Sequence, residues 1–174
     1  MKLFSFDAET NGLYGQTFAI GAVVTDDRGE IARYVSRCPI VGEIDKWVAE
    51  NVLPHIRDVS IDQDSYQSLL NNFFGFYKEH KKDADVIAHV AHPVETKLLR
   101  DMIELDLEAR MWEGPFPLID VAGVLKAKGE DPNSVDGYIK KNGLQVPFDG
   151  NTHHPLYDAI AAGVAYRHLM KQSS

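Results

Sequence analysis

Residues 3–13 read Leu-Phe-Ser-Phe-Asp-Ala-Glu-Thr-Asn-Gly-Leu, an apolar run that ends in two acids and a turn. Side chains alternate between the two faces of a strand, so Asp7 and Glu9 point to the same side. Neighbouring carboxylates repel each other, and burying them is costly unless a cation neutralises them. Hard oxygen ligands of this kind suit Mg²⁺ or Mn²⁺. The pair is therefore a candidate metal site, although a solvated strand end with a turn at Asn11-Gly12 explains it equally well.

The composition is that of an ordinary globular protein. A chain of 174 residues, 44% hydrophobic and 25% charged, fits a single domain over residues 1–174 with a substantial core. The apolar run from Phe18 to Val24 is too short to span a membrane, and residues 1–3 lead into a strand rather than a signal peptide. The single cysteine, Cys38, excludes an internal disulfide and a cysteine zinc cluster. We therefore expect a cytoplasmic protein without a membrane partner.

The formal net charge of −8 argues against a protein that binds nucleic acid through a broad basic surface. This net charge is compatible with a small nucleic-acid-binding site, because acids that cluster around divalent cations contribute negative charge that the metal cancels. Basic residues gather at 78–82, at Lys126 with Lys128, and at Lys140-Lys141. We interpret each group as a solvated helix end rather than a phosphate track.

The pattern of apolar residues predicts an α/β domain. β-Branched and aromatic residues favour strands at 18–25 and 31–37, which form a hairpin and give three antiparallel strands with the opening one. The remaining elements are predicted from helical spacing, from Pro and Gly and from short apolar runs. They are a helix from 45 to 54, a helix at 64–80, a strand at 85–90, a helix at 94–105, a strand at 115–120, and helices at 121–128, 135–141 and 155–170. This order predicts a mixed sheet flanked by helices.

Two further segments place acids or histidines at the start of a helix. Glu95 follows Pro93 in the first turn predicted after a buried strand. Asp158 lies one turn inside the last helix if Pro155 is its first residue, and His153 then lies on the loop before it. Each residue alone has an ordinary explanation, as a favourable first-turn charge or a surface loop residue. Their combination with the acidic pair indicates a site.

Residues 6–13 resemble the first motif of the DEDDh 3′→5′ exonucleases, Asp-x-Glu-Thr-x-Gly-Leu after a hydrophobic strand. Residues 153–159, His-His-Pro-Leu-Tyr-Asp-Ala, resemble the third motif, His-x-Ala-x-x-Asp-Ala, with Pro155 in place of the usual alanine. The two motifs lie near opposite ends of the chain, so the resemblance covers nearly all of it. It implies a ribonuclease H-like fold, in which three antiparallel strands are followed by parallel ones.

The second motif departs from the family. Its aspartate at the start of a helix corresponds to Glu95, which keeps the charge and extends the carboxylate by one methylene. Asp101 is the competing candidate, but it lies six residues further on, about 600° around the helix, and so should face elsewhere. We favour Glu95.

The resemblance implies two divalent cations, Mg²⁺ or Mn²⁺, held by four acids. Asp7 would bridge both cations, Glu9 and Asp158 would complete the ligands of the first, and Glu95 would hold the second. Two such cations activate a water and offset charge on the phosphate in phosphodiester hydrolysis.

The general base implied by the resemblance is His153, whose ordinary pKa near 6.5 suits proton transfer at neutral pH. His154 is the alternative, and the spacing to Asp158 favours His153. We expect the surrounding acids to raise the pKa of His153 until metal binds.

The same resemblance implies that Thr10, Asn11, Gly12 and Leu13 bind the terminal nucleotide. Leu13 would wedge between the last two bases, and the alternative for it is a core contact. Stacking and wedging read no particular sequence, so weak base preference is expected.

The compact domain is most similar to the ribonuclease T-like exoribonucleases. This similarity favours an exonuclease acting on a nucleic-acid 3′ end, single-stranded or in an overhang, with RNA preferred over DNA. It is compatible with a homodimer, although no apolar stripe marks an interface. The alternatives are a nucleic-acid-binding or scaffold module with a metal site impaired by Glu95, and a hydrolase of short oligonucleotides.

Overall fold

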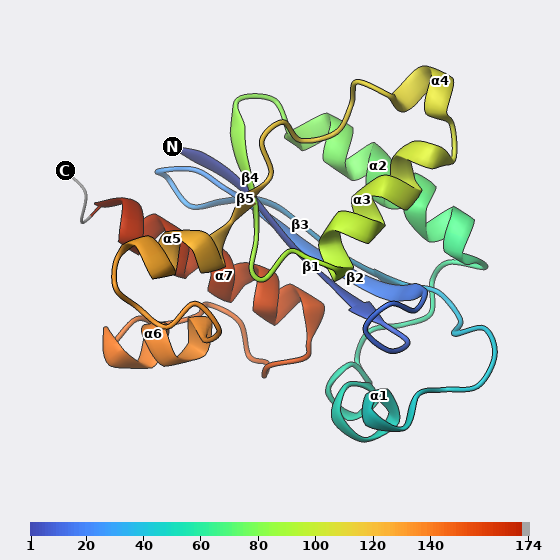
Figure 1. The fold of residues 1–174 in the computed structure, drawn as a ribbon, viewed down its shortest axis with the longest axis horizontal. Helices are drawn as coiled ribbons and strands as arrows, with labels where there is room; N and C mark the ends of the chain where they lie inside the picture. Colours follow the sequence, from blue (N-terminus) through green and yellow to red (C-terminus); the bar gives the residue numbers. More distant parts are fainter. Residues whose placement is uncertain (172–174) are drawn as a thin grey trace.

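The structure is a computed structural model that describes residues 1–171, and its centre is a five-stranded mixed sheet (Figure 1). The strand order is β3-β2-β1-β4-β5. The strands are β1 (Lys2–Thr10), β2 (Thr17–Thr25), β3 (Glu30–Arg37), β4 (Ala84–Ala88) and β5 (Ile119–Asp120). The first three pair antiparallel, and β4 and β5 continue the sheet in parallel with β1. This confirms the predicted mixed sheet of three antiparallel strands followed by parallel ones.

β1 is the central strand, and it extends beyond its parallel neighbour. Its pairing with β4 runs from Lys2 opposite Ala84 to Ser5 opposite Ile87. Its pairing with β2 continues to Thr10. The part of β1 that carries the two acids therefore has a strand on one side only, and its other edge is open to groups from elsewhere in the chain.

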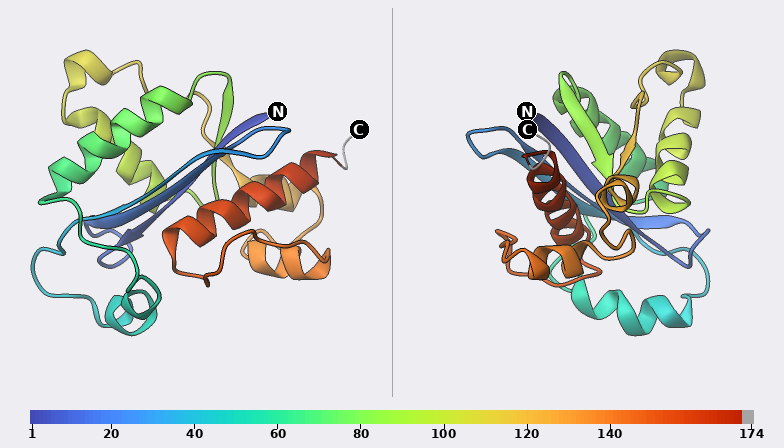
Figure 2. Two further views of the ribbon diagram at one scale, coloured as in Figure 1. Left: turned by 180° about the vertical axis from the view of Figure 1, so that it is seen from behind. Right: turned by 60° about the vertical axis from the view of Figure 1, so that its left-hand side comes forward.

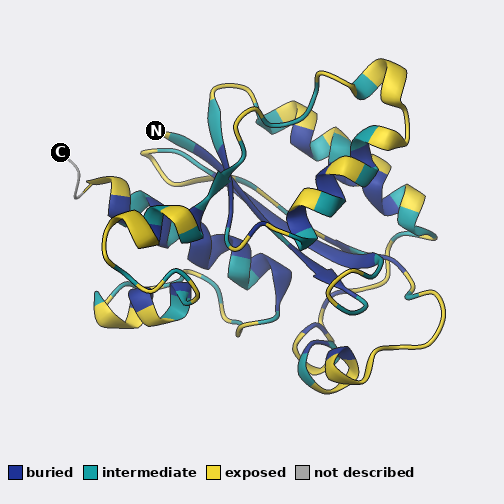
Figure 3. Cartoon of the chain, in the orientation of Figure 1, coloured by how far each residue is buried: buried dark blue, intermediate teal, exposed yellow. Residues whose placement is uncertain are grey.

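Helices cover both faces of the sheet (Figure 2). One face packs against α2 (Tyr66–His80) and α3 (Val94–Glu104). The other packs against α7 (Pro155–Lys171), flanked by α5 (Val121–Ala127) and α6 (Val135–Lys141). Alternation along β1 divides its side chains between these layers: Phe4 meets Tyr77 of α2 with 5.5 Å between ring centroids, and the hydroxyl of Ser5 donates to Ala159 O in α7. Figure 3 shows the buried residues along the sheet and the inner sides of the helices.

The start of α7 lies directly against β2. A Cβ atom placed on Gly21 would lie 2.3 Å from the backbone nitrogen of Leu156, far inside van der Waals contact. Only glycine at this position allows the helix to approach the sheet so closely. Because α7 carries Asp158 in its first turn, Gly21 also fixes the distance between that acid and β1.

We expect Gly21→Ala to lower the melting temperature by about 5–10 °C, because the added methyl group overlaps backbone atoms that cannot rotate away. Thermal unfolding followed by circular dichroism measures this change. The matched control is Gly75→Ala in α2, where a Cβ atom would have no neighbour within 4 Å. That variant should keep or slightly raise the melting temperature, because alanine is the better helix former. Equal melting temperatures for the two variants would contradict this description of the contact.

The predicted strand at 115–120 is mostly wrong, since β5 comprises only Ile119–Asp120. Pro115 and Pro117 have no amide hydrogen to donate to a ladder, which explains why the strand starts late. The predicted strand at 85–90 ends at Ala88, because Val90 adopts a left-handed conformation with φ of 52°.

The predicted helices are present, with ends that differ by at most three residues. α1 (Lys46–Asn51) is followed by a short 3₁₀ helix, η1 (Leu53–His55), which contains the proline expected to stop it. The four-residue helix α4 (Leu107–Arg110) was not predicted, because it is too short to show a helical period. Within residues 1–171, no helix has both the length and the apolar character needed to cross a membrane.

Candidate active site

Four acids converge at the open end of β1. Asp7 and Glu9 come from the strand itself, Glu95 from the first turn of α3 and Asp158 from the first turn of α7. Glu9 and Glu95 are only 8% and 3% exposed. The fold thus brings together the four acids that the sequence singled out, from three segments far apart in the chain.

Burial raises the pKa of every one of these acids, and repulsion by nearby carboxylates raises it further. The pKa of Asp7 lies well above its usual range because of burial and the nearby charges of Asp158, Glu95 and Glu9. Burial, Asp158 and Glu95 likewise raise the pKa of Glu9. The pKa of Glu95 rises to about 8 and that of Asp158 to about 7, with burial as the main cause in both.

The only groups found to oppose these shifts, within the described residues, are backbone N–H groups. They act on Glu95 and Asp158. A buried cluster of four oxygen-ligand acids without a balancing positive charge is the environment that a divalent cation stabilises. The donor set therefore fits Mg²⁺ or Mn²⁺.

Glu95 reaches β1 across the edge that β4 leaves open. Its Oε1 accepts the backbone N–H of Ala8 at 3.2 Å. Asp101 is engaged elsewhere, because its Oδ2 accepts the hydroxyl of Tyr66 at 2.6 Å and pairs with Lys97. The structure thus places Glu95, and not Asp101, among the other acids, while its role as a metal ligand stays a prediction.

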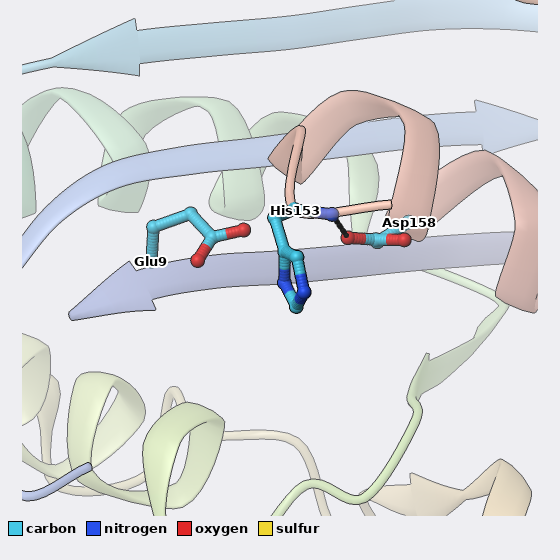
Figure 4. Close-up of side chains that lie close together, drawn as sticks. All are labelled: Glu9, His153 and Asp158. Atoms are coloured by element: carbon cyan, nitrogen blue, oxygen red, sulfur yellow. Dashed lines mark hydrogen bonds between the residues drawn. The ribbon is translucent and has the colours of Figure 1, made fainter. Parts of the chain in front are cut away.

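His153 lies beside the acids on the loop before α7 (Figure 4). Ligand atoms of Glu9, His153 and Asp158 all lie within 4.8 Å of one another. The backbone N–H of His153 donates to Asp158 Oδ2 at 2.8 Å, and its φ of 70° is left-handed. The imidazole is therefore close to the carboxylates, while a backbone hydrogen bond connects its loop to the first turn of α7.

The pKa of His153 is lowered, and our expectation that the acids would raise it is wrong. Burial lowers this pKa most, and the neighbouring His55 lowers it further, while Asp136 acts in the opposite direction. The ring of Trp47 meets that of His153 edge to face, with 5.2 Å between centroids, and His55 lies 6.5 Å away. These two rings come from α1 and η1, and no pattern in the sequence indicates that these elements lie beside residue 153.

His154, the alternative base, has a structural role at the start of α7. It is only 3% exposed, and its Nδ1 accepts the N–H groups of Leu156 at 3.2 Å and Tyr157 at 3.4 Å. Its Nε2 lies 3.4 Å from Asp58 Oδ2. His154 therefore caps the start of α7, and His153 is the imidazole among the acids.

Asp120 is a supporting residue that the sequence analysis missed. Its carboxylate accepts the N–H groups of Val90 at 3.0 Å and Ala91 at 3.1 Å, and that of Ala122 at 2.9 Å. It therefore fixes the turn that leads into α3 and Glu95. Its position between a strand and a helix, where an N-cap is expected, could have indicated this role from the sequence.

Asp136 is the second missed acid. It accepts the hydroxyl groups of Thr152 at 2.8 Å and Tyr157 at 3.3 Å, and it raises the pKa of Asp158. It lies on α6 and joins that helix to the loop before α7. No motif in the sequence distinguishes it from other surface acids.

Two cavities flank the acid cluster. One of about 370 Å³ is lined by Glu9, Leu13 and Trp47, among others. The second, of about 330 Å³, is lined by Asp7 and Asp158 with residues of α6 and the preceding loop. The acids therefore lie between two hollows.

The predicted substrate residues fall into two groups. Leu13 is 59% exposed and, with Thr10 and Gly12, lines the first cavity, so the core contact considered for Leu13 is wrong. The side chain of Asn11 is committed to the protein: it donates to Glu43 O at 2.9 Å and accepts the N–H of Asp45 at 2.8 Å. Contact of these residues with a nucleotide stays a prediction. Because the side chain of Asn11 is already hydrogen-bonded within the protein, this residue would contact a nucleotide through its backbone.

The chain resembles several solved structures in its fold. No protein-family model matches it, and no curated protein is significantly similar in sequence. Exonuclease I superposes with a TM-score of 0.72 at 15% identity over 98% of this chain. The chain has the ribonuclease H-like exonuclease fold.

Two more structures share this exonuclease fold, each over 98% of the chain. Exonuclease X, in complex with 5′-overhanging duplex DNA, gives a TM-score of 0.65 at 16% identity. A 3′-exonuclease that recognises a histone mRNA stem-loop gives 0.69 at 14%. The chain spans 41% of the length of exonuclease I, 92% of exonuclease X and 64% of the 3′-exonuclease.

Proposed function

We propose that this protein is a metal-dependent 3′→5′ exonuclease that releases nucleotides from the 3′ end of nucleic acid. The observation that carries the proposal is the convergence of four acids and His153 at the end of β1. The likeness to three structures named as exonucleases supports it. The position of Glu95 gives no support to a binding module with an impaired site.

The four acids would hold two divalent cations, Mg²⁺ or Mn²⁺. Asp7 would bridge them, Glu9 and Asp158 would complete the first ligand set, and Glu95 would hold the second. When bound, such cations lower the pKa of a water and offset charge on the phosphate oxygens. Buried carboxylates that repel one another are costly without a counter-ion, and this cost would favour the binding of cations by these four acids.

His153 would act as the general base. Its lowered pKa keeps the ring neutral at pH 7, so a ring nitrogen is free to accept a proton from the attacking water. Asp158 would hold the loop that carries this base in place by accepting the backbone N–H of His153.

The substrate would be a single-stranded 3′ end or overhang, with RNA favoured over DNA. The terminal nucleotide would occupy the cavity at Thr10, Gly12 and Leu13, with Leu13 between the last two bases. The 3′-exonuclease of histone mRNA supports RNA, whereas exonuclease X was captured with DNA. We propose ribonuclease T-like activity, with RNA preferred, and the assay below measures this preference.

We expect 5′-labelled single-stranded RNA to shorten stepwise from its 3′ end with Mg²⁺ or Mn²⁺, and EDTA to stop the reaction. A DNA strand of the same sequence, run in parallel, measures the preference for RNA. A 3′-phosphorylated RNA is the control and should be degraded more slowly, because attack starts at the terminal nucleotide. If both strands remained intact with Mn²⁺ at neutral pH, the proposal would be wrong and a binding module would take its place.

A further inference from the structure

A cavity of about 460 Å³, here called the β4 cavity, lies at the end of the sheet opposite the acids. Its walls come from the end of α2, the start of β4 and the segment that leads into β5 (Figure 1). Ala84 of β4 pairs with Lys2 at the beginning of β1, whereas Asp7 and Glu9 lie near the end of that strand. The β4 cavity is therefore separate from the active site, and the proposed nuclease reaction makes no use of it.

The first part of β4 has an open edge. Its pairing with β1 starts at Ala84, but its pairing with β5 starts only at Ile87. Residues 84–86 therefore have a neighbouring strand on one side only, and all three line the β4 cavity. The prolines of the segment before β5 cannot donate to a ladder here. An open strand edge of this kind can accept main-chain hydrogen bonds from an added extended peptide.

The rim of the β4 cavity is positively charged, in a chain whose net charge is −8. Its lining includes Lys78, Lys81 and Lys82. Glu113 pairs with two of these lysines, with its carboxylate 3.6 Å from Lys78 Nζ and 2.6 Å from Lys81 Nζ. Lys82 is exposed and has no ion-pair partner within residues 1–171. Asp85 also lines the cavity, but its carboxylate accepts a tyrosine hydroxyl of α7 at 3.2 Å. The rim thus offers ammonium groups to an anionic ligand.

The same cavity offers apolar contact. Phe116 is 77% exposed and lines the cavity from the segment before β5. Gly114 leaves space for this ring, since a Cβ atom there would lie 3.4 Å from two of the ring carbons. Tyr77 and Val86 form buried parts of the wall, at 1% and 5% exposure. An exposed aromatic ring beside ammonium groups suits a ligand that combines an apolar side chain with carboxylates.

We propose that the β4 cavity docks an acidic peptide segment of a partner protein. The segment lies extended along the open edge of β4, places an apolar side chain against Phe116 and pairs its carboxylates with the lysines of the rim. A nucleic-acid strand fits this surface less well, because phosphate binding uses many cations along the backbone. Here the cations surround one cavity and share it with Glu113. Docking at this end of the sheet leaves the acid cluster open to its own substrate.

Fluorescence anisotropy with a labelled, end-capped peptide tests the proposal. The probe is Asp-Glu-Leu-Phe-Glu-Asp, and two control peptides replace either its acids by lysine or its Leu-Phe pair by Ser-Ser. Wild type should approach saturation with the probe below about 1 mM and should bind each control peptide about 10-fold more weakly. The affinity should fall when NaCl is raised from about 50 mM to about 500 mM, because salt screens exposed ion pairs.

Variants of the cavity should change this affinity in opposite directions. Phe116→Ser and Lys82→Glu should each lower it by about 5- to 10-fold. Glu113→Gln should raise it by about 3-fold, since the amide releases the two paired lysines to the peptide. The matched controls are Val41→Ser and Lys140→Glu, which alter an exposed apolar residue and an exposed lysine outside the cavity. Both controls should bind the probe as wild type does.

Three results would overturn the proposal: no saturation of wild type up to about 1 mM, equal binding of the lysine peptide, or unchanged affinity in both Phe116→Ser and Lys82→Glu. A short single-stranded RNA, measured in EDTA with the same variants, is the remaining arm. Weaker RNA binding with unchanged peptide binding would assign the cavity to nucleic acid instead. Both variants should keep the wild-type rate of 3′-end hydrolysis, so the proposed nuclease activity and this docking are tested separately.

Discussion

Asp158→Asn is expected to lower the rate of 3′-end hydrolysis by about 10²–10³-fold while leaving the fold intact. The amide can still accept the N–H of His153, so the loop geometry is kept, but the negative charge that would hold a cation is lost. The rate of nucleotide release in saturating Mn²⁺ measures the effect. Asp149→Asn, a change at an exposed acid, is the control and should keep the normal rate.

The same variant should make the metal-free protein more stable at high pH. The pKa of Asp158 is about 7 in the folded protein and near 4 in the unfolded chain, so the folded state holds the extra proton between these values. The free energy of unfolding should therefore fall as pH rises from about 4 to about 7. In EDTA at pH 8, Asp158→Asn should melt about 5 °C above wild type, and the difference should shrink at pH 4. A variant that melts lower at both pH values would show that Asp158 is structural.

Glu95→Ala is expected to lower the rate by about 10²-fold with a much smaller effect on nucleic-acid binding, because the carboxylate would act on the transition state. Glu95→Asp should retain appreciable activity, since the charge stays in the first turn of α3 and only its reach changes. Single-turnover rates and dissociation constants for a 3′-tailed RNA separate the two effects.

Asp101→Ala is the control for this series. Its carboxylate contacts Tyr66 and Lys97, so its removal should cost some stability and little rate. A normal rate for Glu95→Ala beside an inactive Asp101→Ala would reverse the assignment of the second motif. If both variants were fully active, neither Glu95 nor Asp101 would take part in the reaction.

Local patterns were sufficient to predict most of the fold. Alternation in residues 3–13 placed Asp7 and Glu9 on one side of a buried strand, and Pro155 marked the first residue of α7. Both signals depend on a few adjacent residues, so they do not depend on which distant segments come into contact. The strand predicted at 115–120 shows the limit, because its prolines remove the donors that a ladder needs.

Properties that depend on packing between distant segments were not predictable. The pKa of His153 is set by burial and by His55, almost a hundred residues earlier in the chain, and so its direction came out opposite to the one expected from the acids alone. The helix cap formed by His154 likewise depends on which segments meet, and so do the hydrogen bonds of the Asn11 side chain to the backbone before α1. Spacing identified the residues of the site, whereas their environment required the fold.

The most direct test of the central claim is anomalous diffraction from crystals soaked in Mn²⁺ with a nucleoside 5′-monophosphate. We expect two manganese peaks beside the carboxylates of Asp7, Glu9, Glu95 and Asp158. A single peak would contradict the two-cation site. The absence of manganese from all four carboxylates would contradict the proposed metal-dependent activity.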